Sequence, residues 1–389
     1  MLKVAVGHSE LVDVEDIIDE ISTQCEEQLH GQKPQAGLLF SAVNVEHSAL
    51  LSAIQEKWPG LPLVGCSTDG EMSSRLGFAE DSVSLALFVS DTLEITVGVG
   101  RNGSKDVVGA AREAYAQARS GTSLAPGLCI VTPASLSFSS EQAVNALKTV
   151  VGPDVPLFGA NAADQWTFEQ TYQFFNSEVL CDSIPLILFS GPVCVASSTQ
   201  SGWKTIGPVG TITKVEQNTV HAIDNSTALA FYKSLLGADA VPTGDRPLAI
   251  LDNEGNISRL RASNEAFDPD TGTVTFFGEF SEGDRVQITV ATRNEILGGT
   301  RASVRLAKER FPAGCLPEAV LFFSCSARKL LLGTQSSEEY AILKEEVGSA
   351  LPIFGFYGFG EIGPSFSGED HCELHNETFV TILIGSARV

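Results

Sequence analysis

The sequence predicts an α/β protein of two domains, in which mixed β-sheets are built around recurring β-α-β units and carry added antiparallel hairpins. Three observations predict this fold. A strand–helix–strand pattern occurs three times, each opening strand is a nearly continuous apolar run, and short strands with Gly and Pro turns lie between the copies. Continuous apolar runs are typical of strands covered on both faces, and β-α-β order favours parallel neighbours joined by a right-handed crossover.

The three copies share their opening and closing segments. The opening strands begin at Gly37, Gly127 and Val320, and the closing Pro-containing strands cover 61–66, 155–161 and 351–356. Helices are predicted between them, over 47–58, 139–152 and 336–350. The second and third helices begin with Ser-Ser-Glu, where a Ser can cap the first turn and the Glu favours the helix dipole.

The segments between the copies predict antiparallel hairpins. Strands are expected over 83–89 and 93–100, and again over 172–179, 184–191 and 192–200. A change of pattern near residue 225 predicts an N-terminal domain of residues 1–225 and a C-terminal domain of residues 226–389. The second domain is expected to hold strands near 247–252 and 273–279, a helix over 295–310 and a last strand from 378 to 384.

Composition limits the possible partners and the setting. The chain has 389 residues and a net charge of −23, and so acidic a surface repels phosphate backbones and anionic lipid. We therefore expect no nucleic acid and no membrane as partners. No signal peptide pattern and no membrane-spanning apolar stretch is seen, and several of the eight Cys lie in apolar runs. A cytoplasmic protein with reduced, buried Cys is expected.

Three short motifs have structural interpretations that we favour. Gly358–Gly363 fits GxGxxG, but Pro364 follows where a dinucleotide site needs a helix. Asp268–Gly272 begins like a calcium loop but lacks the required Gly at its sixth position, so we expect a hairpin turn. His371 and His375 could share a face toward a metal, but no third ligand is evident.

The ends of the third copy's two strands form the best candidate site. Ser324, Cys325 and Arg328 follow the first strand, while Tyr357 and Glu361 follow its neighbour. Parallel neighbours end at one edge, where open α/β sheets bind ligands. The guanidinium of an Arg can form bidentate hydrogen bonds with a carboxylate, which suits a small zwitterion or a carboxylate as ligand. A structural Arg328–Glu361 ion pair and an enzyme with Cys325 or Ser324 as nucleophile remain as alternatives.

Several stretches carry a family resemblance. The chain resembles FIST proteins, two-part sensory modules, in segments that follow the family's order over nearly the whole chain. These are PLVGCSTDGEM, PLFGANAAD, SGWKTIGPVGTITKVEQNTV, ALAFYKSLLG, EGDRVQ, LFFSCSARK, LPIFGFYGFGEIGP and LHNETFVTILIG.

The resemblance implies a sensor that binds a small ligand and is not an enzyme. One subgroup of the family senses nitric oxide through haem and acts on a separate histidine kinase or cyclic-di-GMP enzyme. Haem b is therefore the expected cofactor, with His375 as its first candidate axial ligand and His371 as its second. Asn376 lies in the same matching stretch and joins the candidate ligand site. A small organic ligand such as an amino acid is the alternative, and the Phe-rich second domain (Phe276, Phe277, Phe354, Phe356, Phe359) is compatible with either pocket.

Overall fold

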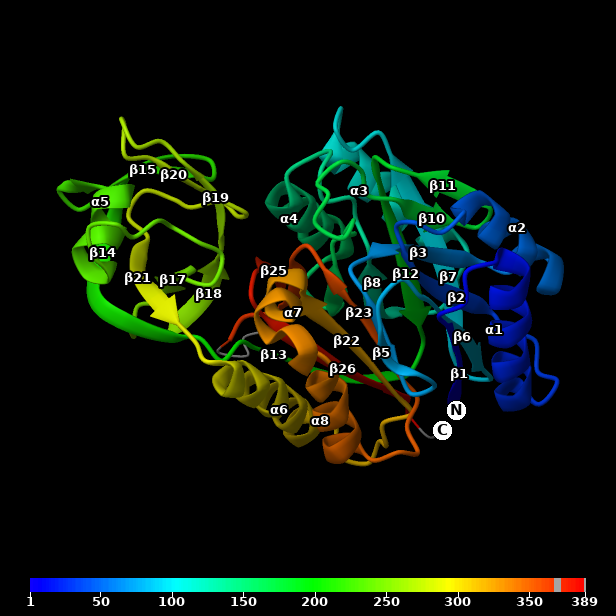
Figure 1. Ribbon diagram of the computed structural model, residues 1–389. Coiled ribbons are helices and arrows are strands. Elements are labelled where there is room, and N and C mark those ends of the chain that lie inside the picture. Colours follow the sequence, from blue (N-terminus) through cyan, green and yellow to red (C-terminus); the bar gives the residue numbers. More distant parts are fainter. Residues whose placement is uncertain (367–371, 388–389) are drawn as a thin grey trace.

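The computed structural model describes residues 1–366 and 372–387. Its core consists of three repeats with one order of elements: strand, helix, strand, helix, strand, hairpin, strand (Figure 1). The first repeat comprises β1 (Leu2–Ser9), α1 (Val14–Leu29), β2 (Ala36–Ala42), α2 (His47–Lys57), β3 (Leu63–Thr68), β4 (Glu71–Ser73), β5 (Gly77–Ala79) and β6 (Val83–Ser90). The second comprises β7 (Glu94–Arg101), α3 (Val107–Ser120), β8 (Pro126–Val131), α4 (Ser140–Val151), β9 (Leu157–Ala160), β10 (Gln173–Phe175), β11 (Glu178–Leu180) and β12 (Ser183–Ser190).

The third repeat is interrupted after its first strand. It comprises β13 (Val193–Gln200), α6 (Arg293–Arg310), β22 (Ala319–Cys325), α7 (Ser326–Leu332), a 3₁₀ turn (Gly333–Gln335), α8 (Ser337–Val347), β23 (Ile353–Gly358), β24 (Glu361–Pro364), β25 (Cys372–His375) and β26 (Phe379–Ser386). The insertion, called the lobe below, comprises β14 (Lys204–Glu216), β15 (Thr219–Ile223), β16 (Ser226–Thr227), α5 (Ala228–Leu236), β17 (Leu248–Leu251), β18 (Ile257–Arg261), β19 (Ser263–Phe267), β20 (Val274–Phe276) and β21 (Arg285–Val290). The three repeats without the lobe are called the body.

Each repeat builds one sheet and lends its hairpin to another. Within a sheet the strands of one repeat lie in the order first, last, second, third, and the second and third are parallel, as predicted. Hairpin β4–β5 of the first repeat extends the third repeat's sheet, β10–β11 of the second extends the first sheet, and β24–β25 of the third extends the second sheet. The exchange is cyclic, so the body has an internal pseudo-threefold arrangement.

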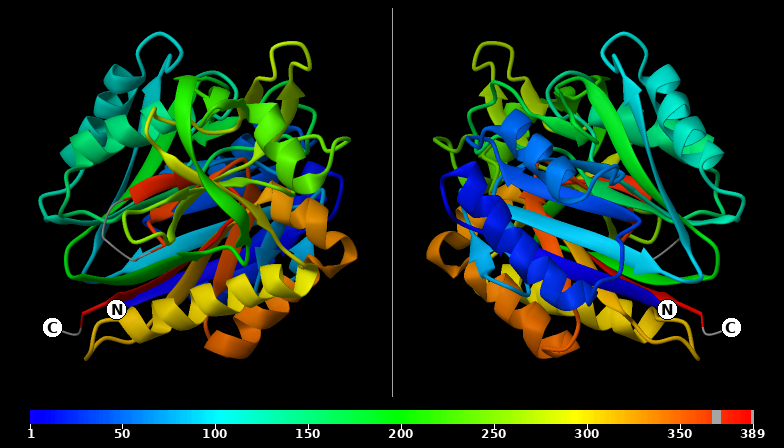
Figure 2. Two further views of the ribbon diagram at one scale, coloured as in Figure 1. Left: turned by 90° about the vertical axis from the view of Figure 1, so that its left-hand side faces the viewer. Right: turned by 90° about the vertical axis from the view of Figure 1, so that its right-hand side faces the viewer.

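The strands are buried on both faces, as the continuous apolar runs predict. Inner faces of all three sheets meet in one central core, which includes Phe40, Ile130 and Phe323. Each outer face packs against the helices of its own repeat: α1 and α2, α3 and α4, or α6 and α8. Figure 2 shows these helices at the periphery, around the strands.

The lobe has a sheet and a core of its own, and lies beside the end of the body formed by α4, α7 and β25 (Figure 1). The domain boundary predicted at residue 225 falls within this sheet, between β15 and β16. The predicted calcium-like stretch is the turn of the β19–β20 hairpin, as expected. Of the last two glycines of the GxGxxG stretch, Gly360 directly precedes strand β24 and Gly363 lies within it, and in the described part of the chain the next element is strand β25.

Three predictions about local structure are wrong. Strands β6 and β7 do not pair with each other, and neither do β12 and β13, because each strand returns to the sheet of its own repeat. Ser139 caps α4 through Gln142 N, but Ser336 does not cap α8 and instead donates to the carbonyls of Lys329 and Gly333.

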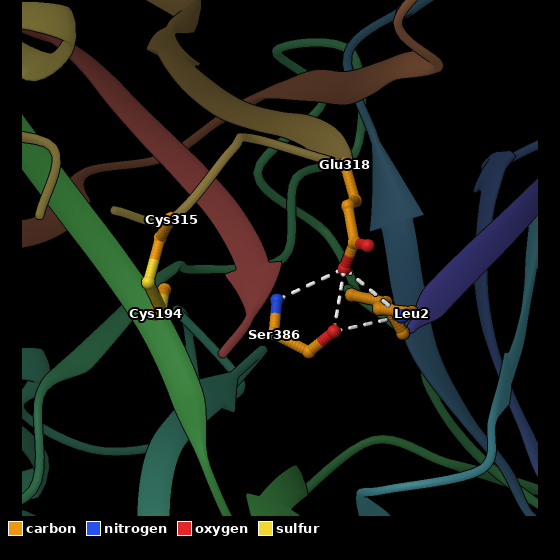
Figure 3. Close-up of a disulfide and its surroundings, with 5 residues drawn as sticks. All are labelled: Leu2, Cys194, Cys315, Glu318 and Ser386. Atoms are coloured by element: carbon orange, nitrogen blue, oxygen red, sulfur yellow. Dashed lines mark hydrogen bonds between the residues drawn. A yellow bond between two sulfur atoms is a disulfide. The ribbon is translucent and has the colours of Figure 1, made fainter. Parts of the chain in front are cut away.

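The prediction of free Cys is also wrong at two positions. Cys194 in β13 is disulfide-bonded to Cys315 in the segment before β22 (Figure 3). Six Cys are free, and of these Cys181 is exposed. Spacing gave no hint of the bridge, because the partners are 121 residues apart. No helix in the described part of the chain combines the length and the apolarity needed to cross a membrane.

Candidate functional site

A cleft of about 550 Å³ lies between the lobe and the carboxyl ends of the parallel strands β8, β9, β22 and β23. This edge of a parallel sheet is where α/β folds commonly bind ligands. The body side of the cleft is formed by Ser135, Leu136, Ser140, Trp166, Phe168, Cys325, Ser326, Ala327, Leu330, Leu331, Gly358, Phe359, Gly360 and Asn376. The lobe side is formed by Thr243, Gly244, Asp245, Ala262, Ser263, Asn264, Glu265 and Phe277.

One loop after β9 presents two aromatic rings to the cleft. The buried Asp164 carboxylate holds this loop: it accepts hydrogen bonds from the backbone N of Phe168 (3.1 Å), Glu169 (2.8 Å) and Gln170 (3.1 Å) and from Thr167 Oγ1 (2.8 Å). Trp166 and Phe168 adopt left-handed backbone conformations, with φ of 66° and 50°. Bulky residues rarely adopt φ above zero, and such strain concentrates at functional sites.

The aromatic rings extend across both sides of the cleft. Phe168 stacks on Phe359 of the body, with ring centroids 5.1 Å apart, and on Phe277 of the lobe, at 6.1 Å. Trp166 meets Phe359 at 5.8 Å, and its Nε1 is buried without a hydrogen-bond partner among the described residues. An apolar, aromatic cleft with a few polar groups is typical of a small-molecule site.

Polar contacts on one side of the cleft hold the lobe to the body. Arg261 of the lobe is fully buried; its Nη2 lies 2.7 Å from the Glu141 carboxylate, and its Nη1 donates to Leu374 O at 2.8 Å. Ser139 Oγ donates to the carboxylate of Glu279 in the lobe at 2.8 Å. These contacts come from the N-terminal end of α4 and from β25, and they fix the lobe's position beside the cleft.

Three predicted site residues meet below the cleft, at a carboxylate that the sequence analysis had not singled out. Glu339 in α8 accepts hydrogen bonds from Arg328 Nη2 (2.6 Å), Ser324 Oγ (2.9 Å) and Tyr357 Oη (2.7 Å). All four side chains are buried. The alternative of an Arg328–Glu361 ion pair is therefore wrong. Arg328 forms its ion pair with Glu339, which α8 brings to the guanidinium.

The remaining groups of Arg328 join elements of the body. Nη1 donates to Ser201 O (2.5 Å), and Nη2 also donates to Ile296 O (3.0 Å) and to Thr300 Oγ1 (2.8 Å). Arg328 is not among the residues that line the cleft. Its guanidinium thus fixes the segment between β13 and the lobe to α6 and α8.

Of the predicted ligand-binding residues, Cys325 and Asn376 line the cleft and Glu361 lies behind them. Glu361 Oε2 accepts from the backbone N and Oγ1 of Thr378, at 3.2 and 2.8 Å. Burial raises the pKa of Glu361 to about 8, and it raises the pKa of the Cys325 thiol well above its ordinary value, helped by the nearby Glu361 and Glu377. Cys325 is therefore a protonated thiol at neutral pH, which is a weak nucleophile.

No described histidine lines the cleft. His375 is buried in β25 against Phe366, and neither ring nitrogen has a partner in hydrogen-bond geometry among the described residues. Burial, reinforced by Arg261, lowers its pKa to about 3, so the ring is neutral. His8 uses both ring nitrogens, toward Ser73 and Ser82. His371 lies outside the described residues, which contain no group of His, Cys, Asp and Glu able to hold a metal.

The sequence analysis missed most of the cleft's aromatic wall. Trp166 and Phe168 follow a quoted stretch by two to four residues, and aromatic residues directly after a repeat strand are the signal that could have indicated them. Of the five Phe noted in the second domain, Phe277 and Phe359 line the cleft. Phe276 belongs to the lobe core, and Phe354 and Phe356 belong to the central core.

Family models match most of the chain. The FIST N domain matches residues 35–226, and the FIST C domain matches residues 228–364. The chain belongs to the FIST family. FIST domains are sensory, ligand-binding domains, and the cleft lies where loops of both matched regions meet.

Solved structures give only slight likenesses. A cyanuric acid hydrolase from A. caulinodans aligns over 100% of both chains at 8% identity and a TM-score of 0.39. A second cyanuric acid hydrolase structure aligns over 100% of both chains at 9% identity and a TM-score of 0.34. Values this low support no conclusion on fold or activity for this FIST protein. No curated protein matches the chain.

Proposed function

We propose that this FIST protein is a sensor that binds a small organic molecule in the cleft between body and lobe. The observation that carries the proposal is the cleft itself: about 550 Å³, lined by aromatic residues of a strained loop and closed on its far side by the lobe. Because the ligand would contact both parts, its binding would favour one position of the lobe over others. A differential affinity of this kind is what turns binding into a signal.

We propose further that the signal passes to a separate protein, such as a histidine kinase or a cyclic-di-GMP enzyme. All described elements belong either to the body or to the lobe. The lobe joins the body through two segments, 201–203 and 291–292, so a change at the cleft would alter the surface that both parts present to a partner. A cytoplasmic location suits such a partner.

The proposal is tested by a thermal-shift screen of small molecules with a variant that blocks the cleft. Leu330 lines the cleft and is 65% exposed, so Leu330→Trp narrows the site without disturbing the core. Leu316 is 60% exposed and lies outside the cleft, so Leu316→Trp is the matched control. A ligand at about 100 times its Kd should stabilise the wild type and the control by about 2.7 kcal/mol, and the blocked variant much less. Equal stabilisation of all three proteins would refute the cleft as the site.

Haem-based sensing of nitric oxide is the second candidate. The observation in its favour is the neutral imidazole of His375, whose ring nitrogens have no partner in hydrogen-bond geometry among the described residues. The described residues do not fit a haem in the cleft, because no described histidine lines it. Titration with hemin separates the candidates. A stoichiometric Soret band that disappears in His375→Ala would favour haem at that residue, whereas loose superstoichiometric binding would leave the organic ligand.

A further inference from the structure

We infer that the ligand of the cleft is an organic cation with a flat or apolar body. The inference rests on the proposed function and concerns the chemical class of the ligand. Among the described residues that line the cleft there is no Lys, Arg or His, whereas two, Asp245 and Glu265, are carboxylates. A cleft without a basic side chain has no cationic group that would form an ion pair with an anionic ligand.

Aromatic faces provide the second part of the site. Phe168 and Phe277 are 45% and 42% exposed and stack at 6.1 Å with an interplanar angle of 16°. Phe168 and Phe359 stack at 5.1 Å and 22°. The face of an aromatic ring attracts a cation placed within about 6 Å of its centroid, and several rings together form a cage for quaternary ammonium groups.

The nearby charges are consistent with a positive ligand. Arg246, which does not line the cleft, pairs with Asp245 at 3.3 Å, and both side chains are 40% exposed. Glu265 forms no ion pair with any described residue, and its backbone is left-handed, with φ of 63°. Arg328 is committed to Glu339. The net field of the lining groups is therefore negative.

A buried carboxyl lies next to a residue of the cleft and would respond to a charged ligand. Glu377 follows Asn376, which lines the cleft, and it is fully buried with neither carboxyl oxygen hydrogen-bonded to a described residue. Unsatisfied buried carboxyl oxygens are costly and rare in folded proteins. Burial, and after it the nearby Glu361, raises the pKa of Glu377 well above its ordinary value, so the carboxyl is neutral at neutral pH, and a cation in the cleft would favour its ionised form. The ligand class thus differs from the small zwitterion or carboxylate that the Arg328 pattern had predicted.

Calorimetric titration with three matched compounds tests the inference. The probes are 4-(trimethylammonio)benzyl alcohol, its neutral isostere 4-tert-butylbenzyl alcohol and the anionic 4-(hydroxymethyl)benzoate. The ammonium compound should bind at least about twofold more tightly than the isostere, since cation–π contacts are worth about that factor at exposed rings and more when desolvated. The benzoate should bind most weakly.

Substitutions identify the side chains that bind the ammonium group. Phe168→Leu keeps an apolar side chain without a π face and should weaken the ammonium compound about 5- to 30-fold, with little change for the isostere. Phe168→Tyr keeps the face and should retain binding. Glu265→Gln should weaken only the ammonium compound, about two- to fivefold, and Glu282→Gln, an exposed lobe carboxylate outside the cleft, should change nothing. Melting temperatures show that each variant is folded.

Two outcomes would overturn the inference. Equal binding of the ammonium compound and the isostere, or tighter binding of the benzoate, would exclude a cation while leaving the cleft as a ligand site. Binding of the ammonium compound that Leu330→Trp does not weaken would place the cation elsewhere. Such a result would count against the proposed function as well, if the hits of the screen also bound the blocked variant.

Discussion

At the scale of single residues, the repeats place one polar side chain at an equivalent position three times. Each is the first residue of a hairpin that extends another repeat's sheet: Glu71, Gln173 or Glu361. In that sheet it pairs with the residue that follows the Gly of the other repeat's third strand. Each of these side chains accepts a hydrogen bond from a hydroxyl group at the start of its repeat's last strand or directly before it. The donors are, in the same order, Ser82, Ser183 and Thr378. Two of the three positions thus hold a carboxyl group that is fully buried.

The pKa of Glu71 leads to a prediction about stability and pH. Burial raises this pKa from 4.5 to about 8, so the folded chain binds more protons than the unfolded chain between these values. Stability therefore falls as pH rises through this window. Glu71→Gln, which copies Gln173, should be more stable than the wild type at pH 8 by on the order of 2 kcal/mol, and less so at pH 5.

Urea unfolding from pH 5 to pH 8 measures this difference. Glu56→Gln is the control, because Glu56 is exposed on α2 and its replacement should leave the slope unchanged. Parallel stability curves for Glu71→Gln and the wild type would show that Glu71 is ionised in the folded protein throughout.

At the scale of elements, the close approach of the second and third strands accounts for the Gly that recurs in the third strand of each repeat. A Cβ on Gly65, Gly159 or Gly355 would lie about 2 Å from a carbonyl oxygen of the parallel neighbour: 1.8 Å from Leu39 O, 1.9 Å from Val131 O and 2.1 Å from Phe322 O. The three positions are equivalent in register, and no conformational freedom of Gly is needed to explain them.

This geometry predicts opposite effects for two Gly→Ala replacements. Gly355→Ala should lower the free energy of unfolding by about 3 kcal/mol or more, because the methyl group overpacks a rigid sheet. Gly298→Ala in α6 has open space around its Cβ and should raise it by about 0.5–1 kcal/mol, through better helix propensity. Denaturant titration of both variants checks the pair. A Gly355→Ala protein as stable as the wild type would mean that the strands can separate at this point.

At the scale of the whole molecule, the segment that carries the disulfide lies beside the start of β1 and the end of β26. Glu318 lies three residues after Cys315, and its carboxylate accepts hydrogen bonds from Leu2 N and from Ser386 N, both at 2.9 Å (Figure 3). Cys194 pairs in register with Gly385 of the last strand. The bridge therefore closes a loop that contains the lobe and α6, and secures it where the first and third sheets meet.

Opening this loop should destabilise the protein as a unit. Cys315→Ser should lower the free energy of unfolding by about 2–4 kcal/mol, the usual effect of losing a bridge that closes a long loop. Cys181→Ser, at an exposed free Cys, is the control. A reducing agent should produce the same loss in the wild type and none in Cys315→Ser. If the reduced and oxidised wild type unfold at the same urea concentration, the bridge does not contribute to stability.

The sequence by itself determined the repeated strand–helix–strand units, their parallel pairing and their burial on both faces. These properties are local: runs such as 37–40 and 320–323 are apolar at every position, and the closing Gly recurs at the same place in each unit. It also predicted a site at the carboxyl edge of the parallel strands, because parallel strands of one repeat must end together, and the cleft lies at this edge.

Only the tertiary structure decided which strands of different repeats meet. Hairpin exchange depends on contacts between residues about 100 to 290 apart, such as Glu361 with Ala160 or Glu71 with Phe356, and no local pattern encodes such pairing. The same long-range packing brought the lobe's Phe277 to Phe168. The turn between α7 and α8 brought Glu339 to Arg328, 11 residues away along the chain. The charge and the aromatic walls of the cleft are properties of that assembly, because each of its sides comes from a different part of the chain.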